Sequence, residues 1–254
     1  MSDALTLPPF FRIVRLAAID STSDEAKRLS RLGAEEGTVV WAEQQSDGHG
    51  RHGRSWISPT GNLYFSVLLR PMRPPAQSMQ LTFAAAVALS EAIVSLLPKG
   101  ASVTCKWPND VLVGGRKIAG ILLESSIDGA GLVDSLVVGI GVNVASHPPA
   151  DALIYPATSL AAEGAAETTP GGVLERICPA LLAWYRRWQS EGFAPLRRSW
   201  LDRAAALQKP VAVRLDDETL EGIFADLDES GALVLQQGGH RRLVLAGDVF
   251  PRTV

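Results

Sequence analysis

A run of seven residues, Gly-His-Gly-Arg-His-Gly-Arg at positions 48–54, lies between two apolar segments that have the character of β-strands. Glycine tolerates positive φ and has no Cβ, so the backbone N–H groups of such a run can converge on one point. Arg51 and Arg54 add permanent positive charge on forked donors. The run therefore predicts two strands joined by a loop that binds an anion, most simply phosphate. The alternative is a flexible, solvated hairpin loop without a ligand.

The same run also fits the dinucleotide-binding pattern G-x-G-x-x-G. That pattern requires a helix directly after it and an acidic residue about 20 positions further on. Here Ser-Trp-Ile-Ser-Pro-Thr-Gly follows at 55–61, which does not predict a helix, and the positions near Arg70 and Arg73 hold no acid. A Rossmann fold is therefore disfavoured.

Apolar periodicity predicts an α+β fold followed by a small all-β unit. Strands are expected at 39–43, 63–69, 103–107, 110–113, 117–124 and 135–144, as a largely antiparallel run, and helices at 78–97 and 173–191. Residues 145–170 read as a long irregular connection. After Gln208 the composition shifts to short alternating runs separated by turn residues, which predicts a small five-stranded barrel. We expect two domains, at 1–208 and 209–254.

Composition narrows the functional class. The net charge is −3 and the isoelectric point 5.8, whereas a general nucleic-acid binder usually carries a basic excess. The only cysteines, Cys105 and Cys178, lie far apart in sequence, which favours a reducing compartment and no disulfide framework. We find neither a signal-peptide pattern nor a stretch of 18 apolar residues. These features predict a cytoplasmic protein without membrane or DNA partners.

Four further motifs carry polar groups that could belong to a site. In Lys-Trp-Pro-Asn-Asp at 106–110 the proline fixes a turn, so Asn109 and Asp110 project from a rigid point, and the Asp110 carboxylate could bind Mg²⁺. The alternative is an ordinary turn, since Asn-Asp after proline is common in turns. Strict alternation in 117–124 places Lys117 on one face with Ala119 and Ile121. Its ammonium group could then lie at the mouth of a pocket, or the side chain could extend from the edge of the sheet into water.

Alternation in 137–144 places Gly139, Gly141 and Asn143 on one face, where a flat ligand or a packed helix could approach the backbone. Asp-Ser-Thr-Ser-Asp-Glu-Ala at 20–26 has the pattern of a helix N-cap, and a helix N-terminus can also bind a carboxylate.

Along the chain the motifs run from the cap segment at 20–26 through the Gly-Arg run at 48–54, Lys-Trp-Pro-Asn-Asp at 106–110 and Arg-Lys-Ile-Ala-Gly-Ile-Leu-Leu-Glu at 116–124 to Gly-Ile-Gly-Val-Asn at 139–143. In that order and at these spacings, they resemble the biotin protein ligase family over nearly the whole chain. The resemblance implies a class II synthetase-like catalytic domain with a mixed or antiparallel sheet, followed by an SH3-like barrel. It implies a ligase that makes biotinyl-5′-AMP from biotin and MgATP and then biotinylates a lysine of a biotin carboxyl carrier protein, as in acetyl-CoA carboxylase. The alternatives are a lipoate ligase or octanoyltransferase of the same ancestral fold, and a non-catalytic sensor that binds DNA.

The resemblance also assigns roles to residues. It implies that Lys117 and Arg51 are catalytic, with Lys117 bridging the biotin carboxylate and the α-phosphate. Biotin would meet Ser21, Thr22, Gln45, Gly48, Arg51, Lys117 and Gly120. ATP would meet Arg51, Arg54, Trp56, Asn109, Lys117, Asn143 and Arg252. Asp110 would bind Mg²⁺.

Two positions depart from the family pattern. His49 stands where the family loop usually has its first arginine, so one permanent charge becomes a titratable one. Ser23 stands where the cap segment usually has asparagine. Only 19 residues precede the cap segment, so we expect a ligase without the helix-turn-helix domain of bifunctional members. The sequence leaves open a homodimer.

Overall fold

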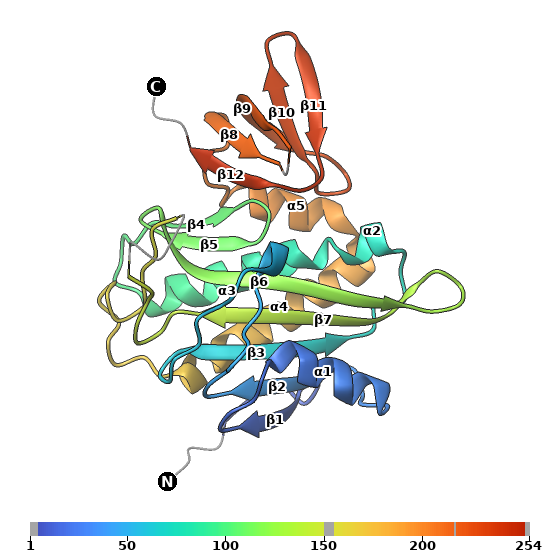
Figure 1. The fold of residues 1–254 in the computed structure, drawn as a ribbon, viewed down its shortest axis with the longest axis vertical. Helices are drawn as coiled ribbons and strands as arrows, with labels where there is room; N and C mark the ends of the chain where they lie inside the picture. The colour runs from blue at the N-terminus through green and yellow to red at the C-terminus, as the bar shows by residue number, and fades with distance from the viewer. Residues whose placement is uncertain (1–4, 150–154, 216, 252–254) are drawn as a thin grey trace.

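The computed structural model describes residues 5–149, 155–215 and 217–251, and its centre is a seven-stranded sheet (Figure 1). The strands are β1 (Arg12–Leu16), β2 (Thr38–Ala42), β3 (Leu63–Leu69), β4 (Val103–Lys106), β5 (Asp110–Val113), β6 (Arg116–Ile127) and β7 (Val133–Val142). Their order across the sheet is β1-β2-β3-β7-β6-β5-β4. Only β1 and β2 pair in parallel within it. The sheet is therefore mixed, which confirms the predicted α+β class, although β1 itself was not predicted.

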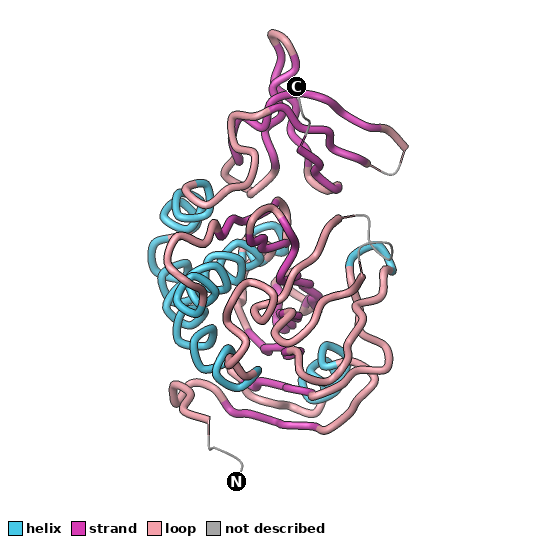
Figure 2. The backbone as a smooth tube through the Cα atoms, turned by 90° about the vertical axis from the view of Figure 1, so that its left-hand side faces the viewer, coloured by secondary structure: helices cyan, strands magenta, loops and turns pink. Residues whose placement is uncertain are grey.

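Helices cover the two faces of this sheet unequally. The long helices lie together on one side, as Figure 2 shows: α3 (Leu81–Leu96), α4 (Pro170–Glu191) and α5 (Phe193–Leu201), with the one-turn α2 (Pro75–Ser78) before them. On the other side, α1 (Thr22–Arg31) packs over β2, β3 and β7. Because α1 covers only part of that face, the neighbouring parts of β6 and β7 remain available for a cavity.

Helix α3 is apolar on all sides because the sheet and α4 enclose it. Residues from Leu81 to Ser90 are all buried. The segment Pro75–Leu96 has the length and mean hydropathy (1.6) of a membrane span, but 72% of the tested window is buried inside the protein. It therefore has the properties of a core helix, and it corresponds to the helix predicted at 78–97.

The C-terminal part is a five-stranded antiparallel sheet in the order β11-β10-β9-β8-β12. Its strands are β8 (Pro210–Arg214), β9 (Thr219–Leu227), β10 (Leu233–Gln237), β11 (His240–Val244) and β12 (Asp248–Pro251). Buried aromatic residues attach it to the helices: the Trp200 ring packs against Phe83 at 5.4 Å and against Phe224 at 6.3 Å between centroids. This contact joins α3 and α5 to β9 of the C-terminal sheet. The sheet begins close to the predicted boundary at 208/209, which stays a prediction.

Candidate active site

A cavity of about 490 Å³ opens on the face of the sheet that carries α1. This volume suits a small organic ligand. The cavity is lined by eleven of the residues to which the resemblance assigns a role, and by the two glycines of the predicted bare face, Gly139 and Gly141; the eleven are Ser21, Thr22, Gln45, Arg51, Arg54, Trp56, Asn109, Asp110, Lys117, Gly120 and Asn143. Gly48 lies just outside the lining, and Arg252 lies outside the described residues. The structure thus brings together residues that are up to 122 positions apart, while their individual roles remain predictions.

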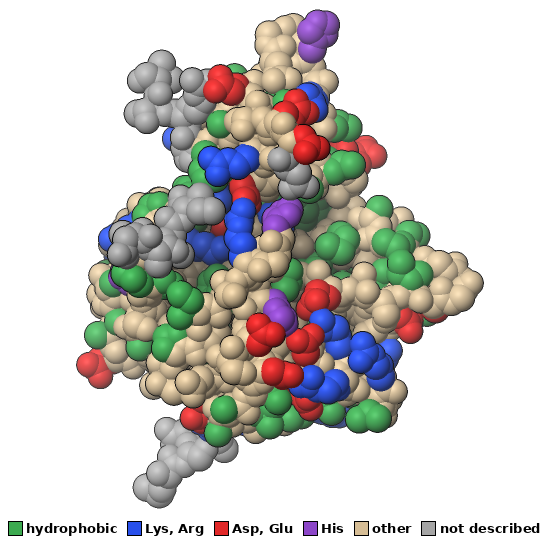
Figure 3. Space-filling view, in the orientation of Figure 1, with side chains coloured by type: hydrophobic (Ala, Val, Ile, Leu, Met, Phe, Trp, Pro, Cys, Tyr) green, Lys and Arg blue, Asp and Glu red, His purple; other side chains and the backbone are tan. Residues whose placement is uncertain are grey.

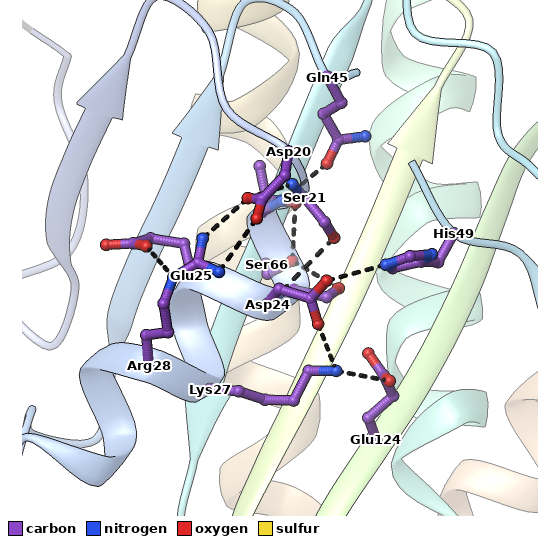
Figure 4. A network of polar contacts seen from close by, with 12 residues as sticks. Asp20, Ser21, Asp24, Glu25, Lys27, Arg28, Gln45, His49, Ser66 and Glu124 are labelled. Atoms are coloured by element: carbon purple, nitrogen blue, oxygen red, sulfur yellow. Dashed lines mark hydrogen bonds and ion pairs between the residues drawn. The ribbon is translucent and has the colours of Figure 1, made fainter. Parts of the chain in front are cut away.

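One end of the cavity is a polar pocket at the start of α1 (Figure 4). Ser21 caps the helix by accepting a hydrogen bond from the Asp24 N–H, which confirms the N-cap prediction. The Thr22 N–H donates to Gln45 Oε1 at 2.8 Å, and Thr22 Oγ1 lies 2.9 Å from Ser66 Oγ. These buried groups hold one another in fixed positions, so they offer a preorganised polar surface. Ser66, on β3, carried no sequence motif and was missed.

The floor between the two ends of the cavity is nearly bare of side chains. A Cβ atom on Gly141 would lie 2.5 Å from Cε2 of Trp56, and one on Gly120 would lie 2.9 Å from Cζ3 of the same ring. The flat ring of Trp56 therefore lies directly on the backbone of β6 and β7. The Trp56 Nε1 atom is buried without a hydrogen-bond partner among the described residues. Glycine is required at position 139 for a different contact. A Cβ atom there would lie 2.6 Å from Ser23 Oγ, so its absence allows α1 to approach β7.

Gly48 is explained by the geometry of its loop. A Cβ atom there would lie 2.5 Å from the carbonyl oxygen of Trp56, which itself follows the loop, and 2.9 Å from Gln45 Nε2. Only glycine permits this approach of the two loop ends. Between them, the loop makes a single turn of 3-10 helix at Arg51–Gly53, with His52 in the left-handed region at φ 54°.

Lys117 reaches the cavity by a route that strict alternation did not predict. A β-bulge interrupts the pairing of β5 with β6: Val111 pairs with Ala119, and Leu112 pairs with Lys117. Ile118 therefore has no paired residue on β5, and the side chains of Ile118 and Ala119 are both buried in the core. Lys117 then lies on the side of Gly120, its Nζ 3.3 Å from where a Cβ of that glycine would be. The prediction that Lys117 shares a face with Ala119 and Ile121 was therefore wrong.

At the opposite end of the cavity, two lysine side chains contact the same carboxylate, that of Asp110. Lys117 Nζ lies 2.6 Å from Asp110 Oδ1, and Lys106 Nζ lies 3.4 Å from Asp110 Oδ2. Lys106 is 8% exposed, and its ammonium group stands 4.6 Å from the ring centroid of Tyr155 and 5.7 Å from that of Phe250. Burial lowers the pKa of Lys106. Lys106 and these two aromatic residues were missed, although Lys106 belongs to a motif that the sequence analysis discussed.

The loop arginines meet the C-terminal sheet at this end. Arg51 Nη1 donates to Asn109 Oδ1 and to the Gly247 carbonyl oxygen, each at 3.3 Å, and Arg54 pairs with Asp248 Oδ2. Burial of the Asp248 carboxyl acts to raise its pKa, but the bond and charge of Arg54 outweigh burial and keep the pKa low. Asp248 was missed because this contact spans 194 positions in the sequence.

The polar groups at this end leave an excess of positive charge. Arg51, Arg54, Lys106 and Lys117 carry four positive charges, against the two carboxylates Asp110 and Asp248. The arrangement therefore suits an anionic ligand. Asn143 closes the nearby wall; it is 3% exposed, and its Nδ2 donates to the Thr158 carbonyl oxygen at 2.9 Å.

The described residues offer little to a metal ion in the absence of a ligand. Among them, no group of three or more His, Cys, Asp or Glu side chains could hold one. Asp110 is the predicted metal ligand, and a lysine lies within 3.4 Å of each of its oxygens. Mg²⁺ is commonly bound by one or two carboxylates together with phosphate oxygens of the substrate. The residues fit a metal that a nucleotide brings with it.

Comparison with known proteins agrees with this geometry. Residues 16–143 match the model of the biotin/lipoate A/B protein ligase family, and residues 207–252 match the biotin protein ligase C-terminal domain. The chain is 41% identical to a biotin–[acetyl-CoA-carboxylase] ligase of Paracoccus denitrificans, over 92% of this chain and 98% of that one. It is 33% identical to a bifunctional ligase/repressor of Bacillus subtilis, over 91% of this chain and 71% of that one. The biotin protein ligase of Aquifex aeolicus, solved with biotin and ATP, superposes with a TM-score of 0.79 at 27% identity, over 96% and 99% of the two chains.

Proposed function

Because the chain belongs to the biotin/lipoate A/B protein ligase family, and within it to the biotin protein ligases, we propose that it forms biotinyl-5′-AMP from biotin and ATP and transfers the biotinyl group to a lysine of a biotin carboxyl carrier protein. The observation that carries this proposal is the cavity itself. A preorganised polar pocket at α1 and a cluster of four cations lie at its two ends, joined by a glycine floor on which the Trp56 ring lies.

We assign one end of the cavity to each substrate. The ring system of biotin fits the pocket of Thr22 and Gln45, with its carboxylate directed along the floor toward Lys117. The ATP α-phosphate fits between Lys117 and Arg51. Both reacting groups are anions, so the site must neutralise charge and hold a carboxylate oxygen in line with the α-phosphorus. That oxygen bonds to phosphorus, the bond to the β-phosphate oxygen breaks, and pyrophosphate leaves.

In the second step the amine of the carrier lysine attacks the carboxyl carbon of the mixed anhydride. The new amide bond forms as the bond to the phosphate oxygen breaks, and AMP leaves. Arg51 and Lys117 stabilise the phosphate charge that develops on the leaving AMP. Neither step requires a nucleophilic side chain, and Cys105 and Cys178 are both buried outside the cavity.

Mg²⁺ belongs to this proposal as a companion of ATP. When bound, it would neutralise phosphate charge, and Asp110 is the carboxylate placed to hold it. A homodimer and a cytoplasmic location remain predictions from the sequence.

The alternative function is ligation of lipoate or octanoate, since the matched family includes both kinds of ligase. The C-terminal sheet favours biotin, because residues 207–252 match a domain of biotin protein ligases. Exchange of labelled pyrophosphate into ATP tests the choice. We expect exchange that depends on biotin, and exchange supported by lipoate or octanoate but not by biotin would overturn the proposal.

A further inference from the structure

His49 connects the loop of residues 48–55, hereafter the anion loop, to helix α1. Its Nε2 lies 2.9 Å from Asp24 Oδ2, and the other oxygen of Asp24 lies 2.6 Å from Lys27 Nζ (Figure 4). Lys27 in turn pairs with Glu124 Oε1 of β6 at 2.8 Å. Asp24 stands three residues after Ser21, on the helix whose first turn forms the polar pocket. The contact therefore ties the loop at the cationic end of the cavity to the helix at the other end.

Of the two residue types in this contact, histidine is the one that can change charge near neutral pH. Burial acts to raise the pKa of Asp24, but hydrogen bonds from Lys27 and His49 outweigh burial and lower it. Asp24 is therefore a carboxylate and an acceptor, so the Nε2 atom that faces it carries the hydrogen. An imidazole becomes charged within the range of about pH 5 to 8. Protonation would convert a hydrogen bond from a neutral donor into an ion pair.

The other charged groups around His49 do not reverse the stronger attraction between His49 and Asp24 that protonation would bring. Lys27 on α1 and Glu124 on β6 are already paired with each other. Within the loop, His52 Nε2 lies 3.2 Å from Arg51 Nη2 and accepts its hydrogen bond. Protonation of His52 would repel Arg51, so any effect of His52 on the loop has the opposite sign.

We propose that His49 is a pH-dependent positioning residue that holds the anion loop on helix α1, closing the loop more firmly at low pH than at high pH. The consequence for catalysis rests on the proposed function: a loop that is held closed retains biotinyl-AMP until the carrier arrives. An arginine at this position, which the family resemblance leads one to expect, would hold the loop at all pH values between 5 and 8.

Hydrogen exchange in the ligand-free protein tests the contact without any reference to catalysis. Protection factors for residues 48–55, corrected for intrinsic exchange rates, are measured from about pH 5 to about pH 8. Both side chains are about one third exposed, so solvent screens the pair and the expected decrease with rising pH is only about two- to fivefold. We expect uniformly high protection in His49→Arg and uniformly low protection in His49→Gln.

His52→Gln is the matched control, because it removes the other imidazole of the same loop. This variant should keep the decrease of the wild type, and added salt at 1 M should reduce the decrease in both proteins. If the wild type and His49→Gln have the same pH profile, or if His52→Gln abolishes the decrease, the proposal is overturned.

Release of biotinyl-AMP tests the consequence. Dissociation of the preformed adenylate should be about two- to fivefold faster at pH 8 than at pH 6 in the wild type and equally fast at both pH values in His49→Arg. A wild-type rate that does not change with pH, or the same change in His49→Arg, would contradict the assigned role in retention. Biotin-dependent pyrophosphate exchange at a single pH separates the two proposals, because a protein without exchange would fail the proposed function while hydrogen exchange would still decide the role of His49.

Discussion

Replacement of Lys117 by methionine should abolish most of the adenylation activity and leave the fold intact. The Lys117 ammonium group is the cation placed between the glycine floor and Asp110, where both the carboxylate and the α-phosphate would lie. Removal of one preorganised donor of this kind typically costs about 3 to 4 kcal/mol in the transition state, or 100- to 1000-fold in rate. Methionine keeps the apolar stem of the side chain near the Trp56 ring, so packing changes little.

The effect on stability should be much smaller than the effect on catalysis. Asp110 keeps a cationic partner in Lys106, at 3.4 Å, so the lost interaction with Lys117 costs about 1 to 2 kcal/mol of unfolding free energy. The assay is biotin-dependent pyrophosphate exchange, with urea unfolding measured in parallel. Lys99→Met, which changes an exposed lysine outside the cavity, is the control and should be unaffected in both measurements. If Lys117→Met exchanges pyrophosphate within threefold of the wild type, the role derived for Lys117 is incorrect.

Three further changes have defined outcomes. Arg51→Gly should release reactive biotinyl-AMP, because the proposed phosphate contact and the bond to the Gly247 carbonyl oxygen are both lost. Streptavidin blots should show more labelling of serum albumin than with the wild type, and equal labelling would count against the role of Arg51. Gly139→Val should push α1 off the sheet, since even a Cβ atom would lie 2.6 Å from Ser23 Oγ. We expect a loss of about 1 to 3 kcal/mol of unfolding free energy, measured with urea, and weaker biotin binding, measured by calorimetry. An unchanged affinity for biotin would contradict this placement of biotin. Trp200→Ala should cost about 3 to 5 kcal/mol of unfolding free energy, because its ring is fully buried between α3 and β9; a loss below 1 kcal/mol would show that the aromatic contact does not hold the C-terminal sheet in place.

Local sequence signals were sufficient for most of the fold. Strands β3 and β5 have the predicted bounds, because glycine, proline and turn residues delimit each run of apolar residues. Helix α5 was missed because Gly192 and Pro195 lie within four residues of each other, and such residues usually mark a break in helical structure. Strand β1 was missed because its residues are mostly exposed, so burial imposed no clear alternation on them.

The site shows where local reasoning ends. The motifs could be found because each concentrates glycine or charge within a few residues, as in the anion loop. The side on which Lys117 lies could not be found, because a bulge depends on pairing with the neighbouring strand and has no signature in β6 alone. Asp248 and Phe250 were also out of reach, since the packing of the C-terminal sheet against α5 places them at the cavity.

The most direct test of the function is intact-mass analysis of a biotin carboxyl carrier domain after incubation with the protein and MgATP, in a mixture of biotin, lipoate and octanoate. The account predicts a single adduct with the mass of one biotinyl group, attached to one lysine and absent when either ATP or biotin is omitted. A lipoyl or octanoyl adduct would contradict it, and so would a carrier that remains unmodified while the protein is folded and binds biotin.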